Sequence, residues 1–268
     1  MLSPKEYKQI TKEKRKSEGR KLMRGFSKRS YKSELLDDPD IPFVDIRRNM
    51  QELEFINTRL GGHAITVQGA IKLMGNRKKI HICEIGCGGG DNLNAIEKYC
   101  LKHEIDAHFT GIDIKDTCIH YAKENTRFIR KADFICADYR DAVFLEKPDI
   151  IFSSLFCHHF TDEQVKDIIE WKYRNSKLGF FINDLQRHPV AYHSIKMLSK
   201  AFSKSYLVIN DAPLSVKRGF SKTDWLHIFS MVHLPFMHST IRWKWAFRWL
   251  ITVSKEHHPM PIGQLAPA

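Results

Sequence analysis

Long apolar runs are missing from this chain of 268 residues. None approaches the roughly 18 residues that a membrane-spanning helix needs, and the N-terminus lacks the apolar stretch of a signal peptide. Cysteine is sparse as well, with six residues and no Cys-x-x-Cys pair, which favours reduced thiols in the core. We therefore expect a cytoplasmic protein whose hydrophobic residues, 43% of the chain, form one sizeable core.

The basic charge is concentrated in one segment. The formal net charge is +12, but residues 1–32 hold twelve Lys and Arg against three Glu and so contribute +9, leaving about +3 for the rest. Few apolar residues could anchor this segment, so we predict a disordered or loosely helical arm. A solvated tail is its simplest role, with peripheral contact to an anionic membrane or RNA binding as alternatives.

Glycines gather where the apolar segment 80–85 runs into the turn 86–90, Gly-Cys-Gly-Gly-Gly, and then into a helix. Residues without a Cβ let the backbone turn tightly and let a ligand approach the main chain. A dinucleotide fingerprint needs glycine at its sixth position, where this chain has Asp91, so NAD is disfavoured. With Glu84 two places before the first glycine, the run Glu-x-Gly-x-Gly-x-Gly resembles motif I of the class I S-adenosylmethionine-dependent methyltransferases.

The next strands end in carboxylates at the spacing that a nucleotide-binding fold requires. The segment 107–114 reads as a strand with Asp113 near its end, 29 residues beyond Glu84, the length of one strand-helix-strand unit. A carboxylate there can accept both hydroxyls of a ribose. A third strand, 132–138, ends on Asp138, which the resemblance places beside the adenine amino group. A surface acid at a strand end is the alternative for each.

The resemblance covers about residues 45–253 and implies a Rossmann-like α/β fold, a seven-stranded sheet with helices on both faces. Its implied cofactor is S-adenosylmethionine, with no metal required. We expect the arm over 1–32, an N-terminal helical cover over 33–76, the methyltransferase domain over 77–256 and a tail over 257–268. The residues expected at the cofactor are Glu84, Gly86, Cys87, Gly88, Asp113, Ile114, Asp138, Tyr139 and Ser154.

The segment 153–160, Ser-Ser-Leu-Phe-Cys-His-His-Phe, follows the apolar strand 149–154 at the sheet edge where open α/β folds bind ligands. It lacks the (Asn/Asp)-Pro-Pro-aromatic turn of base and glutamine methyltransferases, which argues against a nucleic-acid acceptor. Its form resembles small-molecule methyltransferases of the quinone and polyketide groups. His158 or His159 could take the proton of a phenol or enol. A hydrogen bond to the following helix is the alternative, and the pattern does not choose between the two histidines.

Polar residues also follow the fifth predicted strand, 178–185, at the same edge of the sheet. The connection that follows, 187–222, is longer than usual and predicts a lid over the site. An N-cap with neighbouring surface residues is the alternative for the first polar residues. The aromatic alternation over 241–249 predicts a closing strand. The residues expected at the substrate mouth are Asp184, Arg187, His188, Tyr192 and Arg218.

Together these patterns favour O-methylation of a hydrophobic phenolic, quinone or polyketide-type acceptor. Three alternatives stay open: an RNA methyltransferase that grips its substrate with the basic arm, a C- or N-methyltransferase of a small molecule, and a membrane-associated binding module without catalysis. The identity of the acceptor and the oligomeric state do not follow from the residues.

Overall fold

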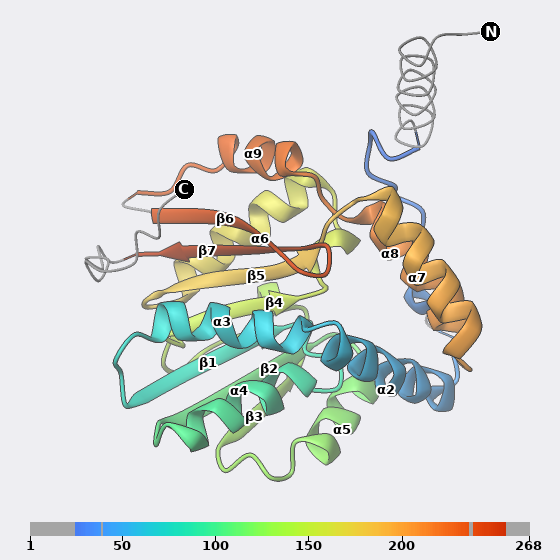
Figure 1. Ribbon diagram of the computed structural model, residues 1–268. Helices are drawn as coiled ribbons and strands as arrows, with labels where there is room; N and C mark the ends of the chain where they lie inside the picture. The colour runs from blue at the N-terminus through green and yellow to red at the C-terminus, as the bar shows by residue number, and fades with distance from the viewer. Residues whose placement is uncertain (1–24, 39, 236–237, 256–268) are drawn as a thin grey trace, which may run out of the picture.

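The computed structural model describes residues 25–38, 40–235 and 238–255. Its centre is a seven-stranded sheet of order β3-β2-β1-β4-β5-β7-β6 (Figure 1). The first five strands are parallel, and β7 runs antiparallel to both β5 and β6. This confirms the predicted fold class. The strands are β1 (Lys79–Ile85), β2 (Asp106–Asp113), β3 (Ala132–Cys136), β4 (Ile150–Ser154), β5 (Gly179–Leu185), β6 (His238–Lys244) and β7 (Arg248–Ser254).

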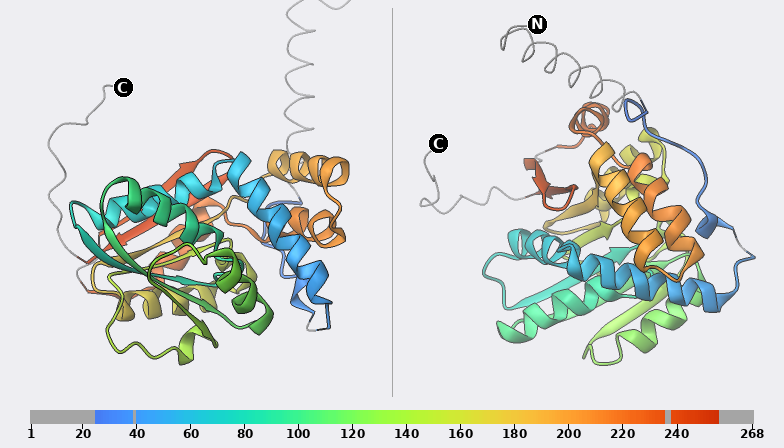
Figure 2. Two further views of the ribbon diagram at one scale, coloured as in Figure 1. Left: turned by 90° about the horizontal axis from the view of Figure 1, so that it is seen from below. Right: turned by 45° about the vertical axis from the view of Figure 1, so that its right-hand side comes forward.

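Helices cover both faces of the sheet (Figure 2). Helices α3 (Gly62–Met74) and α4 (Asp91–Lys102) share one apolar core with the sheet, and α6 (Asp162–Asn175) and α9 (Lys222–Ser230) share the other. Helix α5 (Asp116–Asn125) packs on β2 and β3. Strand β4 is buried throughout, as expected of a central parallel strand.

A second group of helices lies beyond the carboxyl ends of the parallel strands. It consists of α2 (Phe43–Arg59), α7 (Pro189–Phe202) and α8 (Tyr206–Arg218), with α7 and α8 packed as a hairpin (Figure 1). This hairpin occupies most of the predicted lid segment. The predicted helical cover is divided, because α2 lies in this group whereas α3 packs directly on the sheet. Within the described residues, no helix combines the length and hydropathy that crossing a membrane requires.

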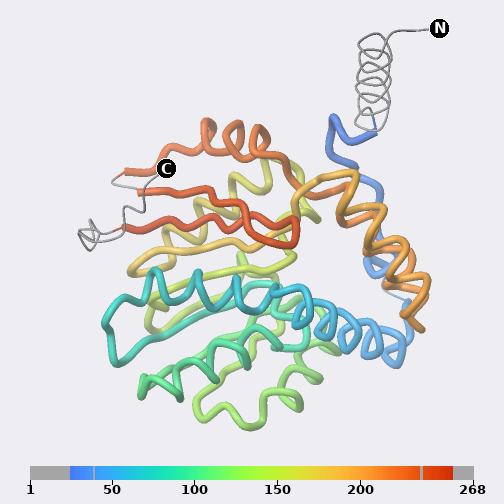
Figure 3. Tube along the Cα trace, viewed as in Figure 1, coloured from blue at the N-terminus to red at the C-terminus, as the bar shows by residue number. Residues whose placement is uncertain are grey.

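The N-terminal strap (residues 25–38) runs beside α8 and reaches the carboxyl edge of the sheet (Figure 3). Phe26 and Arg29 are buried. The Arg29 guanidinium donates to the backbone oxygens of Arg218 and Phe160 and to the carboxylate of Asp162. The predicted arm is therefore wrong for residues 25–32: a basic side chain reads as solvated in sequence, but here buried carbonyl and carboxylate oxygens satisfy it. Residues 1–24 and the predicted tail lie outside the described residues.

Two further predictions can be compared with the structure. All six cysteines are free thiols, and all but Cys136 are buried, as predicted for core thiols.

The alternating segment 241–249 is not one strand, because β6 ends at Lys244 and β7 begins at Arg248. The turn between them carries Trp245 and Phe247, which face the cavity described below.

Candidate functional site

The glycine turn between β1 and α4 is held against the end of β2. Gly86 has a φ of +66°, and a Cβ at this position would lie 2.2 Å from the ring of Phe156, so the turn requires glycine here. The backbone N–H of Gly88 donates to Asp113 Oδ2 at 3.0 Å. Gly88 also has positive φ, and the space where its Cβ would lie is open. A ligand can therefore approach the main chain at Gly88.

Asp113, the last residue of β2, lines the cavity that is described below. Its second carboxylate oxygen accepts the N–H of Lys115 at 3.0 Å. Burial raises the pKa of this carboxyl, although the N–H donors of Lys115 and Gly88 oppose the effect. The Asp113 carboxylate and the backbone of Gly88 therefore lie side by side. A carboxylate beside a glycine turn can bind the two ribose hydroxyls of a nucleoside.

Glu84 supports this turn from below and is not among the residues that line the cavity. Its Oε1 accepts from Asn92 Nδ2 at 2.9 Å, and burial raises its pKa well above the usual value. Its Oε2 is buried without a hydrogen-bond partner among the described residues, and its predicted contact with the cofactor stays a prediction. A side chain at the end of a central strand can point either to the ligand or into the protein, and the motif does not distinguish the two.

One cavity of about 860 Å³ lies over the carboxyl ends of the strands. Asp138, whose pKa the hydrogen-bonded Arg140 lowers, lies in its wall. Asp91 and Asn92 also line it and were not predicted. The predicted cofactor residues that line this cavity are Gly86, Cys87, Gly88, Asp113, Ile114, Asp138, Tyr139 and Ser154.

The remainder of the cavity is mainly apolar. Helix α2, the α7–α8 hairpin, the strap and the β6–β7 turn each contribute side chains to it. A volume within the range of small-molecule sites, lined largely by apolar groups with a few polar ones, suits a hydrophobic ligand. Its apolar lining includes Leu36, Ile46, Met50, Leu53, Ile56, Leu60, Phe156, Ile195, Leu198, Val216, Trp245 and Phe247.

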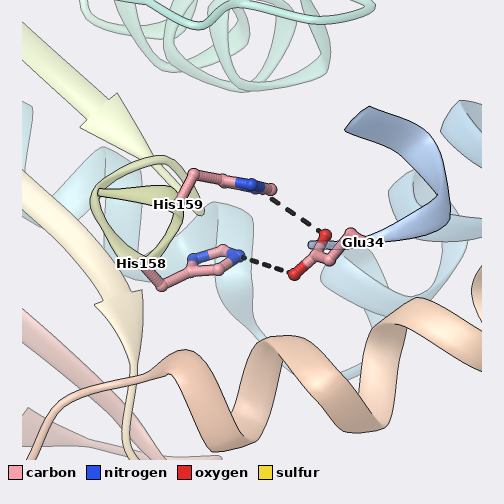
Figure 4. A group of neighbouring side chains, drawn as sticks. All are labelled: Glu34, His158 and His159. Carbon is pink, nitrogen blue, oxygen red and sulfur yellow. Dashed lines mark ion pairs between the residues drawn. The ribbon is translucent and has the colours of Figure 1, made fainter. Parts of the chain in front are cut away.

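Three of the polar residues that line the cavity form the histidine cluster, which we define as Glu34, His158 and His159 (Figure 4). Nε2 of His158 lies 3.8 Å from one Glu34 carboxylate oxygen, and Nε2 of His159 lies 3.9 Å from the other. His158 and Glu34 are buried, whereas the His159 side chain is 26% exposed. Nδ1 of His159 lies 3.6 Å from Asp37 Oδ1.

Asp184 holds His158 from behind. Its Oδ1 lies 2.8 Å from Nδ1 of His158, and its Oδ2 accepts the backbone N–H of Cys157 at 2.7 Å. Burial raises the pKa of Asp184, but His158, the N–H of Leu185 and His159 together outweigh burial, so that the pKa is lowered overall. Asp184 was predicted at the substrate mouth, and it is instead fully buried behind the imidazole.

The two arginines predicted at the substrate mouth are buried and bind protein groups instead. Arg187 donates to the backbone oxygens of Phe26 and Gly219. Arg218 donates to the backbone oxygens of His158 and His159 at 3.1 and 2.9 Å. Neither lines the cavity. Both predictions are wrong, because each guanidinium is satisfied by carbonyl oxygens that only the folded chain brings near.

The predictions for His188 and Tyr192 are wrong as well. His188 is the N-cap of α7 and accepts the backbone N–H of Val190 at 3.2 Å, which was the alternative interpretation. Tyr192 packs edge-on against Phe26, with ring centroids 5.4 Å apart. Neither residue is part of the cavity wall. At the polar end of the cavity, the sequence therefore identified the two histidines but missed Glu34 and Asp37, whose one local signal is an acidic segment directly after a basic one.

The histidine cluster also forms, among the described residues, the one group of three potential metal ligands. Two ligands of a tetrahedral Zn²⁺ lie about 3.3 Å apart, given metal–ligand distances near 2.0 Å, whereas the separations here are 3.8 and 3.9 Å. The Arg218 guanidinium already lies 3.9 Å from Glu34 Oε1. The separations are therefore about 0.5 Å longer than those of a formed zinc site.

Comparison with known proteins agrees with this arrangement. Residues 82–179 match the protein family described as "Methyltransferase domain". The plantazolicin methyltransferase BpumL, solved in complex with SAH, is similar in structure with a TM-score of 0.60, 19% identity, and coverage of 87% of this chain and 93% of that one. No curated protein sequence matches significantly.

Two further solved structures share the fold. The plantazolicin methyltransferase BamL, in complex with a triazolic desmethylPZN analog and SAH, has a TM-score of 0.54 and 15% identity, covering 80% of this chain and 98% of that one. Human N-acetylserotonin methyltransferase in complex with SAM has a TM-score of 0.54 and 17% identity, covering 79% and 55%. Likeness at these identities shows a common fold.

Proposed function

We propose that this S-adenosylmethionine-dependent class I methyltransferase acts on a hydroxyl group of a hydrophobic small molecule. The family match supports the enzyme class and the cofactor that the sequence predicted, and the fold is shared with methyltransferases solved with SAM or SAH. The acceptor and the atom methylated are the proposal. It rests on one observation: Nε2 of His158 faces an apolar cavity that also contains the glycine turn and Asp113.

Asp184 determines how His158 can act. Because the Asp184 carboxylate accepts at Nδ1, the proton of neutral His158 lies on Nδ1, and Nε2 keeps its lone pair toward the cavity. Such a nitrogen can accept the proton of an acceptor hydroxyl. His159 has no comparable partner at 2.8 Å, so we assign the base to His158 and leave His159 a supporting role.

The reaction is a direct transfer. When bound, S-adenosylmethionine supplies a methyl group already activated by its positively charged sulfur. The acceptor's O–H bond breaks as its proton moves to Nε2 of His158, and the oxygen forms its bond to the methyl carbon as the carbon–sulfur bond breaks. The Asp184 carboxylate then balances the charge of the imidazolium. The cavity walls align the reactants, and alignment alone can lower such a barrier by about 7 kcal/mol or more.

The apolar lining supports a hydrophobic acceptor, with a polar end at the histidine cluster. A small acceptor is also consistent with the BamL structure, which holds a triazolic desmethylPZN analog in the same fold. The alternatives that depend on the basic arm rest mainly on residues 1–24, outside the described residues. Peripheral membrane contact through residues 1–32 stays a separate prediction from the chemistry proposed here.

A product assay with a hydrophobic phenol tests this function. Wild-type protein, S-adenosylmethionine and 3-pentadecylphenol should give a methyl ether, detected by mass spectrometry, and pentadecylbenzene, which lacks the hydroxyl, should give no product. His158→Ala should lower kcat on the order of 10²-fold or more, with cofactor affinity unchanged. The exposed His120 offers a matched control, since His120→Ala should leave kcat unchanged. Equal activity of the His158 and His120 variants would remove His158 from the mechanism.

A further inference from the structure

Glu34 comes from the N-terminal strap, not from the sheet that carries the other site residues, and it is built into place. Its Oε1 accepts from Ser215 Oγ on α8 at 2.7 Å. Its backbone N–H donates to Asp37 Oδ2 at 2.9 Å. Its side chain is 4% exposed and lines the cavity. Burial raises the pKa of this carboxyl, and the neighbouring His159, Ser215 and Arg218 oppose the effect.

The separations within the histidine cluster define a site for one atom. At 3.8 and 3.9 Å, the carboxylate oxygens are too far from the Nε2 atoms for direct hydrogen bonds. The ligand atoms of all three residues lie within 4.8 Å of one another. A hydroxyl oxygen placed among them can therefore lie about 2.8 Å from Nε2 of His158, a normal hydrogen-bond distance, and give its one proton to that nitrogen.

We infer that the histidine cluster is the subsite for the reacting hydroxyl of the acceptor, and that Glu34 is a catalytic residue contributed by the strap. This inference rests on the proposed O-methyl transfer. The hydroxyl donates its one proton to Nε2 of His158, as above, and the Glu34 carboxylate lies beside the nitrogen that receives it. No further reactant is needed.

Glu34 has a specific effect on this step. Positive charge develops on His158 as it takes the proton, and the Glu34 carboxylate lies 3.8 Å from the nitrogen that receives it. Asp184 contacts the opposite nitrogen of the ring at 2.8 Å. Two buried carboxylates thus flank one imidazole and stabilise its cation in the transition state. The catalytic site is incomplete without the strap.

The variant Glu34→Gln tests this role, because it keeps the size and the Ser215 contact of Glu34 and removes the charge. We expect kcat with 3-pentadecylphenol to fall on the order of 100-fold, while the affinity for S-adenosylmethionine stays within about twofold. Asp211→Asn is the matched control. Asp211 holds the strap on α8 by accepting the backbone N–H groups of Leu35 and Leu36 at 2.9 and 3.0 Å. A kcat loss in Asp211→Asn equal to that in Glu34→Gln would overturn the inference.

A second measurement needs no turnover. With S-adenosylhomocysteine bound, wild-type protein should bind 3-pentadecylphenol more tightly than pentadecylbenzene, and Glu34→Gln should reduce that preference about tenfold. An unchanged preference contradicts a hydroxyl subsite at Glu34. Stoichiometric Zn²⁺ binding by wild type that is lost in Glu34→Gln would also contradict this subsite, since Glu34 would then be a metal ligand. If wild-type protein forms no ether, the proposed function fails; if it does and Glu34→Gln matches it, only the role of Glu34 fails.

Discussion

Asp184 and His158 are joined through Oδ1 and Nδ1 at 2.8 Å, and both side chains are buried at the carboxyl edge of the sheet. Strand β5 supplies the acid, and the short helix η3 (Cys157–His159) after β4 supplies the imidazole. These strands are neighbours in the sheet, so residues 26 positions apart in sequence form one acid-base pair.

Replacing Asp184 by Asn should separate its two effects on His158, which are orienting the imidazole and stabilising the imidazolium charge. We expect kcat of Asp184→Asn to fall on the order of 10²-fold or more, because an amide cannot stabilise the imidazolium. Cofactor affinity, measured by calorimetry, should not change. Asp184 also accepts the backbone N–H of Cys157, so the assay belongs well below the melting temperature. A folded variant with normal kcat would show that His158 acts without Asp184.

Asp113 should dominate cofactor affinity. Removing a charged hydrogen-bond acceptor costs about 1.5 to 3 kcal/mol, so Asp113→Ala should weaken binding of S-adenosylmethionine by at least tenfold in calorimetric titration. Asp133→Ala is the control, since Asp133 lies on β3 and pairs with His108 at the surface. If Asp113→Ala binds within about threefold of wild type, the cofactor site has been misplaced.

That the glycine turn and Asp113 lie at one cavity could be predicted from sequence because the signals are local. The glycines at 86–90 are adjacent, and Asp113 follows at the length of one strand-helix-strand unit. The acceptor half depends on contacts between distant segments, as for Glu34, which meets His158 across 124 positions of sequence. Arg187 and Arg218 were misassigned for the same reason, since the carbonyl oxygens that bind them carry no mark in the sequence.

Lys172 on α6 should make stability depend on alkaline pH. It is fully buried, donates to Ser153 Oγ at 2.5 Å, and burial lowers its pKa to about 8. In the unfolded chain the lysine pKa is near 10.4. Between about pH 8 and 10.4 the unfolded state therefore binds more protons than the folded state, and the contribution of Lys172 to the free energy of unfolding rises with pH.

The predicted gain is about 3 kcal/mol in the free energy of unfolding. Urea denaturation of wild type and Lys172→Met at pH 7 and pH 10 measures it, because titration of the other groups is common to both proteins. From pH 7 to pH 10, the free energy of unfolding of wild type should rise by about 3 kcal/mol relative to that of Lys172→Met. A stability difference that does not change with pH would mean that Lys172 stays protonated in the fold up to pH 10, so that burial does not lower its pKa.

Arg218 should stabilise both the strap and η3. It donates to the backbone oxygens of Lys32, His158 and His159, and a lysine cannot reproduce this planar set of donors. We expect Arg218→Lys to lower the free energy of unfolding by about 2 to 4 kcal/mol. Arg140→Lys, at an exposed pair with Asp138, should leave it nearly unchanged. Similar losses in the two variants would contradict a structural role for Arg218.

The atom that receives the methyl group tests the central proposal most directly. Wild-type protein would be incubated with S-adenosylmethionine labelled with ¹³C in its methyl group and with 3-pentadecylphenol, and the labelled product located by NMR correlation to the ring. We predict the label in a methoxy group, formed by wild type and lost in His158→Ala. Label on a ring carbon, or no product while the cofactor binds, would contradict O-methylation at the histidine cluster.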